Sequence, residues 1–121
     1  MYIQKYAYFC IEQINKMEIV FEKKYLSELY YEGKTRDKKH RFQPEIIKRY
    51  KLRIETLESA NCVEDLFTIN SLRYEVLRGD KKRISSIRVN DQYRIEFTTS
   101  KVEAETVVTI CNILELSNHY K

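Results

Sequence analysis

Alternating apolar and polar residues in the second half of the chain constrain its fold most strongly. The segments ISSIRV (84–89), YRIEFTT (93–99) and ETVVTICNILEL (105–116) each show this pattern, which predicts three strands. A fourth strand is predicted at LRYEVL (72–77). Gly79 falls in the turn that follows it, where a positive φ is expected. Consecutive strands with short connections predict a mainly antiparallel sheet.

The first half of the chain predicts a strand followed by two helices. MEIVFE at 17–22 is rich in β-forming residues, and residues 23–34 carry apolar side chains at helical spacing up to a stop at Gly33. Pro44 suits the first position of a second helix over 44–60. This order predicts an α+β fold in which the N-terminal strand and two helices pack on one face of a small, twisted, mainly antiparallel sheet.

Composition limits the class of protein. A chain of 121 residues, 43% hydrophobic and 33% charged, is the size of one folded domain. Its three cysteines are widely spaced and it has only two histidines, so we expect neither a disulfide framework nor a metal site, and no cofactor. The N-terminus lacks the pattern of a signal peptide or a membrane span, which predicts a cytoplasmic protein. The cysteines are Cys10, Cys62 and Cys111.

Positive charge is concentrated in one stretch, residues 72–94. It holds seven Lys or Arg against three acids, so its net charge of +4 equals that of the whole chain. Such a concentrated positive field indicates a polyanionic partner, and RNA or DNA is the commonest one in a cell. The alternative is a lysine-rich turn that only keeps a sheet edge soluble.

Strand parity predicts that two arginines face each other. In the two strands that flank residues 90–92, apolar residues occupy the odd positions and should face the core. A three-residue loop then pairs Ile87 with Ile95. The same register places Arg88 opposite Arg94, about 5 Å apart on the exposed face of the sheet. Either a wet surface tolerates their repulsion, or an anion such as a phosphate binds between them.

The end of the last strand places a histidine near this pair. Continued alternation predicts that His119 lies on the arginine face, where it could act as an acid or base near neutral pH. The alternative is a solvent-exposed terminal histidine. The same alternation predicts that four apolar residues of the strand face the core: Val108, Ile110, Leu114 and Leu116.

Four motifs together carry a family resemblance. They are Leu-Arg-Gly-Asp at 77–80, Ser-Ser-Ile-Arg-Val at 85–89, Asn-Asp-Gln-Tyr-Arg-Ile-Glu-Phe at 90–97, and Asn-His-Tyr at 118–120. In this combination the chain resembles the RelE/ParE superfamily of toxins, and within it the HigB-like branch. The resemblance covers roughly residues 17–121 and leaves residues 1–16 as an N-terminal extension. Either Met17 is the true translation start, or the extension is an added helix.

The resemblance implies a RelE-like fold and the toxin half of a type II toxin–antitoxin system. It further implies a ribosome-dependent mRNA endoribonuclease, an mRNA interferase that inhibits translation without a metal or cofactor. In such a reaction the ribose 2′-hydroxyl attacks the adjacent phosphate, the bond to the 5′ oxygen breaks, and the products are a 2′,3′-cyclic phosphate and a free 5′-hydroxyl. The implied partners are the ribosome, mRNA and a HigA-like helix-turn-helix antitoxin, with the toxin as a monomer within a toxin–antitoxin hetero-oligomer.

Site residues follow from the family positions. Arg78 takes the place of a lysine that stabilises the phosphate, and Arg94 takes that of an arginine with the same task. His119 occupies the position of the histidine that exchanges protons. Glu75 stands where relatives often carry a histidine, so it is a candidate base or merely the partner of an arginine. Seven further residues are predicted to bind RNA: Arg73, Lys81, Lys82, Arg83, Arg88, Tyr93 and Tyr120.

The chain departs from the family pattern at two positions, and two other functions remain possible. Arginine in place of lysine at position 78 keeps the charge but removes a group that can release a proton. Tyr93 replaces the usual tryptophan. The chain could instead be a ParE-like protein that poisons DNA gyrase without cutting RNA, or a nucleic-acid-binding domain without activity. The basic helix 44–60 is either a contact to ribosomal RNA or a solvated charged face.

Overall fold

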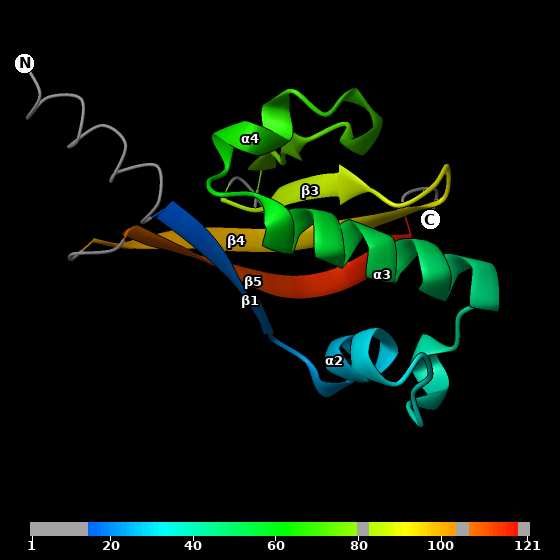
Figure 1. Ribbon diagram of the computed structural model, residues 1–121. Coiled ribbons are helices and arrows are strands. Elements are labelled where there is room, and N and C mark those ends of the chain that lie inside the picture. The colour runs from blue at the N-terminus through cyan, green and yellow to red at the C-terminus, as the bar shows by residue number, and fades with distance from the viewer. Residues whose placement is uncertain (1–14, 80–82, 104–106, 119–121) are drawn as a thin grey trace, which may run out of the picture.

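The computed structural model describes residues 15–79, 83–103 and 107–118, which fold into one sheet with helices on one side (Figure 1). The strands of the sheet are β1 (Asn15–Phe21), β2 (Glu75–Val76), β3 (Ser85–Arg88), β4 (Tyr93–Glu103) and β5 (Val107–Asn118). The helices are α2 (Lys24–Tyr31), α3 (Pro44–Ser59) and α4 (Glu64–Phe67), with single 3₁₀ turns at Lys38–His40 and Asn70–Leu72.

The sheet has the strand order β1-β5-β4-β3-β2. β1 pairs with β5 in parallel, and the other neighbouring strands are antiparallel. Helices α2 and α3 lie against one face (Figure 1). The expected α+β arrangement, an N-terminal strand and two helices on a mainly antiparallel sheet, is confirmed.

Both long helices form where the sequence predicts them. The backbone of Gly33 has φ +74°, and its amide donates to the Glu28 carbonyl at 3.1 Å, which ends the turn after α2. Pro44 is the first residue of α3, and one stripe of that helix is fully buried. The stripe consists of Tyr50, Ile54 and Leu57. It packs α3 onto the sheet.

The connection between α3 and β3 differs from the expectation. The predicted strand at 72–77 shortens to Glu75–Val76, and α4 and the turn at Asn70–Leu72 were not predicted. A helix of four residues is too short to show a hydrophobic period, so the sequence carries no signal for it. Leu66 and Leu72 are nevertheless fully buried, which anchors this connection to the core.

The predicted register of β3 and β4 is confirmed. Ile87 pairs with Ile95, and Arg88 pairs with Arg94. The Val89 amide donates to the Tyr93 carbonyl at 2.9 Å across the three-residue loop. Gly79 has the expected positive φ, +70°.

The predicted facing of β5 is wrong for most of its length. Glu96 pairs with Glu115 but Phe97 pairs with Ile113, so Leu114 is an extra residue in a β-bulge. The bulge shifts the alternation by one residue. Leu116 does face the core, whereas three other residues predicted to do so lie on the opposite face: Val108, Ile110 and Leu114. The buried residues of that half of β5 are Thr109, Cys111 and Ile113.

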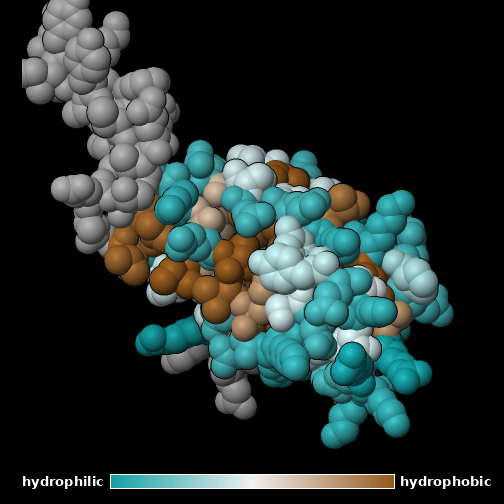
Figure 2. Space-filling model, turned by 60° about the horizontal axis from the view of Figure 1, so that its bottom comes forward, coloured by the Kyte–Doolittle hydropathy of each residue, from teal (hydrophilic) through white to brown (hydrophobic). Residues whose placement is uncertain are grey.

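Apolar side chains also reach the surface at one end of the sheet. Figure 2 shows brown side chains gathered on the left of the molecule. Val20 of β1 and Val102 of β4 are exposed, and Val102 pairs with Val108 of β5. Within the residues described, no helix is long and apolar enough to cross a membrane.

Candidate functional site

Arg94 lies on the sheet face opposite α2 and α3, where three hydrogen bonds hold its guanidinium. Its Nε donates to Ser86 Oγ at 2.8 Å, and its Nη2 donates to the backbone carbonyls of Arg73 at 2.6 Å and of Ser86 at 3.2 Å. No acceptor among the described residues lies on its Nη1. The guanidinium is therefore fixed at one end and still has N–H groups to offer to a ligand.

The expectation of a wet arginine face needs correction. Arg94 and Glu96 do point away from the helices, but each is only 8% exposed. The segment that leads into β2 covers Arg94, because the Arg73 carbonyl accepts its hydrogen bond. Strand parity gives the side on which a residue lies, but it carries no information on what packs over that side.

Glu75 supplies a negative charge beside Arg94. The two residues form an ion pair at 3.6 Å, and the Glu75 side chain remains 51% exposed. Burial lowers the pKa of Arg94, whereas the nearby Glu75 raises it. Arginine stays protonated in either case. Glu75 is thus placed as the counterion of Arg94, at a position from which it still reaches solvent.

Arg88 adds a second positive charge to this face. It lies directly across the ladder from Arg94, and its charge lowers the pKa of Arg94. Its Nη2 donates to Asp91 Oδ1, a carboxylate in the exposed loop between β3 and β4. The site therefore brings together two arginines, and each of them is paired with a carboxylate that faces water.

The remaining predicted cations among the described residues flank β2. Arg78 and Arg83 lie in the connection between β2 and β3, Arg73 lies just before β2, and all three are exposed. The charge of Arg73 also acts on Arg94. Four predicted site residues lie outside the described part of the chain: Lys81, Lys82, His119 and Tyr120.

Tyr93 lies on the helix side of the sheet, opposite Arg94. Its ring packs edge-on against Phe42 with centroids 5.3 Å apart. It lines a hollow of about 460 Å³ together with His40 and Ser117. Tyr93 and the arginine pair therefore border the same strand from different faces.

Three residues that sequence reasoning missed help to shape these surfaces. Ser86 accepts a hydrogen bond from Arg94. Its even position in the predicted strand, on the same face as Arg88 and Arg94, was the sequence signal that could have identified it. His40 Nδ1–H donates to Asp37 Oδ2 at 2.9 Å, and the His40 ring stacks on Tyr25 with centroids 3.7 Å apart. This hydrogen bond lowers the pKa of Asp37. The hydrogen bond between Asp37 and His40 fixes the loop before α3. In the sequence, only the Asp-x-x-His spacing indicated this contact.

Among the described residues, no three His, Cys, Asp or Glu lie close enough together to hold an ion. The site instead contains guanidinium groups, which bind phosphate or carboxylate through charge-assisted hydrogen bonds.

Comparisons with known proteins identify the family of the chain. Residues 19–110 match the family model described as the RelE-like toxin of the type II toxin-antitoxin system HigB. The chain is 38% identical over 82 residues to Toxin HigB-1 of Vibrio cholerae serotype O1, an alignment that covers 67% of this chain and 82% of that protein. The fold resembles a YoeB/ParE toxin from Agrobacterium tumefaciens with a TM-score of 0.54 and 14% identity, over 86% of this chain and 100% of the other. The chain belongs to the HigB-like family of RelE-like toxins from type II toxin–antitoxin systems.

Proposed function

We propose that this toxin is a ribosome-dependent mRNA endoribonuclease that inhibits translation. The observation that carries the proposal is Arg94, a buried guanidinium held by Ser86 and the Arg73 carbonyl, with Arg88 across the ladder. A cation that is held in place and shielded from water can stabilise the negative charge that builds up on a phosphate during attack by the 2′-hydroxyl. Such a cleavage requires no metal.

The proposed roles follow the charges of the site. Arg94 stabilises the pentavalent phosphate, and Arg78 reaches it from the connection after β2. Glu75 orients Arg94 and is the described carboxylate best placed to accept a proton. His119 is proposed as the acid on the strength of its family position. Contacts to RNA are proposed for seven residues: Arg73, Lys81, Lys82, Arg83, Arg88, Tyr93 and Tyr120.

The proposed partners follow from the same assignment. A site built mainly of positive charge binds a phosphate but does little to orient the ribose, so the ribosome is proposed to position the message. We assign the protein to the cytoplasm, where it meets translating ribosomes. A HigA-like helix-turn-helix antitoxin is proposed to neutralise it, with the toxin as a monomer within the toxin–antitoxin hetero-oligomer.

Mapping of RNA ends after induced expression tests the function. New 5′ ends within the codons of translated messages, absent when translation initiation is blocked, are the expected result. Double-strand DNA breaks without RNA cuts would overturn the proposal in favour of gyrase poisoning. Purified toxin with ribosomes and a single message shows whether the cleavage is direct.

Variants then test the site. Arg88→Ala should weaken cleavage while leaving the unfolding temperature unchanged or raised, because its main partner is an exposed carboxylate and its neighbour is another arginine. His119→Ala should abolish growth arrest. Arg36 is an exposed arginine near α2, on the far side of the fold. Arg36→Ala removes the same charge, and it should change neither cleavage nor growth arrest. Full toxicity of both site variants would show that the site is elsewhere.

A further inference from the structure

A hollow of about 460 Å³, here named the aromatic hollow, lies beside β5 beyond the end of β1. The last pair of β1 and β5 is Phe21 with Ile113, so the residues of β5 that follow have no strand on that edge among the described residues. Its volume lies within the range of about 300–1,000 Å³ that is typical of small-ligand sites. The lining comes from the loop before α3 and from the adjoining ends of β4 and β5, and it includes Lys39, His40, Arg41, Phe42, Tyr93 and Ser117.

Three rings contribute to the wall of the aromatic hollow. Phe42 and Tyr93 pack edge-on with centroids 5.3 Å apart, and both are only partly buried. His40 is held by its hydrogen bond to Asp37 at 2.9 Å and by stacking on Tyr25. Because these contacts fix the rings before a ligand arrives, binding has a smaller entropic cost. Partly exposed aromatic rings of this kind are the surfaces on which unpaired nucleobases stack.

Two cations of the aromatic hollow are available to a ligand. Lys39 and Arg41 are exposed, and among the described residues neither side chain makes a hydrogen bond or an ion pair. The carboxylates nearby are already engaged, Asp37 by His40 and Glu115 by Lys23 at 3.4 Å. Positive charge beside aromatic rings is complementary to a nucleotide, whose base stacks while its phosphate accepts charge-assisted hydrogen bonds.

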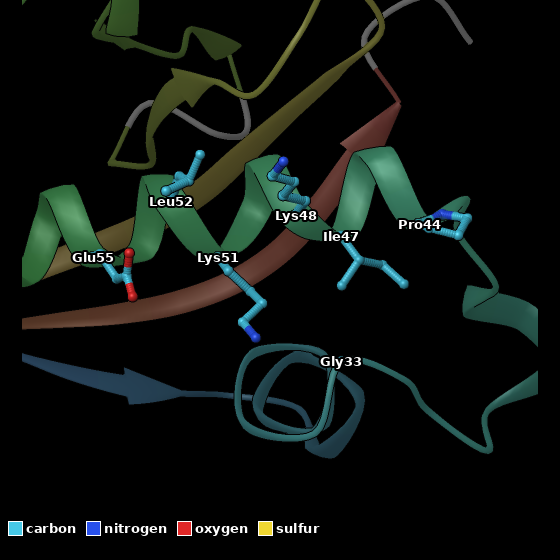
Figure 3. A pocket seen from close by; sticks show the side chains of 7 residues that line it. All are labelled: Gly33, Pro44, Ile47, Lys48, Lys51, Leu52 and Glu55. Atoms are coloured by element: carbon cyan, nitrogen blue, oxygen red, sulfur yellow. The ribbon is translucent and has the colours of Figure 1, made fainter.

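A second hollow, between α3 and the turn at Gly33, lacks this combination. Figure 3 shows Ile47 and Lys51 pointing from α3 towards that turn. None of the described residues that line it is aromatic, and its lysines share it with Glu55. The aromatic hollow is therefore the better match for a nucleotide.

The aromatic hollow lies at the same end of the sheet as Arg94. Tyr93 and Asn118 are the last pair of the β4–β5 ladder, and Arg94 and Ser117 are the next pair. Tyr93 and Arg94 are neighbours in the chain on opposite faces of β4. An RNA strand that passes round this end of the sheet can therefore present one phosphate to Arg94 and an adjacent base to the hollow.

We propose that the aromatic hollow binds one nucleotide of single-stranded RNA beside the scissile phosphate, with its base on Phe42 and Tyr93 and its phosphate on Lys39 and Arg41. The inference rests on the proposed function, since it gives a place to a nucleotide that flanks the reacting one. It adds Lys39, Arg41 and Phe42 to the residues proposed to contact RNA. A peptide strand of the antitoxin on the open edge of β5 is the competing occupant.

Abasic RNA tests the stacking without requiring cleavage. The probes are single-stranded RNAs with a 2′-deoxyribose at the cleavage position, in each of which one nucleotide lacks its base, and anisotropy at low salt gives their affinities. With the parent protein, loss of the base at one position beside the cleavage site should weaken binding about tenfold, the scale of base–aromatic stacking. With Phe42→Leu the same position should no longer matter, because the ring that contacts the base is gone.

Tyr31→Leu is the matched control, because Tyr31 is an exposed ring outside the aromatic hollow. It should keep the parent protein's dependence on the base. A purely structural role of Phe42 would weaken binding of every probe alike, so lost stability in Phe42→Leu does not imitate the expected result. Equal weakening of all probes, or a parent protein that binds no probe or shows no dependence on position, overturns the inference.

Salt dependence tests the cations with the complete RNA. The double variant Lys39→Ala/Arg41→Ala removes two exposed side chains and should lose one phosphate contact. Its slope of log K against log[salt] should then fall by about 0.7, the value for a single strand. Arg36→Ala removes an exposed arginine that lines a different hollow, and its slope should match that of the parent protein. An unchanged slope in the double variant overturns the phosphate assignment.

The outcome is separable from that of the proposed function. Dependence on one base in a protein that cuts no message would leave the nucleotide site standing and remove the nuclease. Normal cleavage by a protein without that dependence would do the reverse. Loss of antitoxin binding by Phe42→Leu, with RNA binding unchanged, would assign the aromatic hollow to a peptide and overturn the inference.

Discussion

At the scale of single residues, Arg94 combines a structural role with its proposed chemical role. Three of its N–H contacts go to Ser86 and to the Arg73 carbonyl, so the side chain joins β4 to β3 and to the segment before β2. Loss of activity in an Arg94 variant can therefore come from loss of charge or from loss of folding. Separating the two requires variants matched for stability.

Arg94→Ala should cost about 2 kcal/mol of unfolding free energy, because it leaves buried acceptors without their donor. Arg94→Lys should recover part of that cost, yet cleavage should stay low because an ammonium group cannot reproduce the guanidinium fork. Urea unfolding gives the first quantity, and a ribosome-coupled cleavage assay gives the second. Substantial cleavage by Arg94→Lys would contradict a role for the fork in the reaction.

At the scale of elements, a buried tyrosine joins the two long helices. Tyr50 of α3 is fully buried and its hydroxyl donates to the Leu26 carbonyl of α2 at 2.7 Å. Leu26 is also fully buried, so this hydrogen bond lies inside the core between the helices and the sheet. It fixes how α2 sits against α3.

Tyr50→Phe should lower the unfolding free energy by about 1 kcal/mol, because one buried hydrogen bond is lost while the ring still fills its place. Measurement by urea unfolding should show an unchanged m-value. Cleavage at temperatures well below unfolding should be normal, which makes this variant the control for Arg94→Ala. A loss of cleavage equal to that of Arg94→Ala would mean that instability alone explains both.

Elements with a regular period were predictable, and irregular ones were not. The alternation of β3 and β4 gave their register, including Arg88 opposite Arg94, because a shift by one residue would have buried a charge. The same logic failed on β5, where Leu114 is an extra residue that has no signature in the sequence.

At the scale of the whole molecule, the sheet separates a core from a charged surface. One face packs against α2 and α3, and the other carries Arg88 and Arg94. Cys111 lies on the core side and is fully buried. Burial raises the pKa of its thiol to about 12. Its reactivity therefore reports on the integrity of the whole fold.

A thiol-alkylating reagent at pH 8 should leave Cys111 unmodified in the folded protein. With a pKa of about 12, only about one molecule in ten thousand carries the thiolate, and the reagent has no access to it. Cys62, which is partly exposed, should react before Cys111. Peptide mapping by mass spectrometry, in buffer and in urea, measures both. Equal rates for Cys111 in the two conditions would mean that the core opens readily.

The bulge at Leu114 lets β5 hold one extra residue without turning the rest of the strand over. Upstream of it, the inward residues of β5 are odd-numbered, and downstream Leu116 takes that role. Deletion of this single residue would leave plain pairing, with Glu115 still opposite Glu96 and Leu116 still towards the core. The strand therefore keeps the same side inward on both sides of the bulge, although the parity of the residue numbers changes.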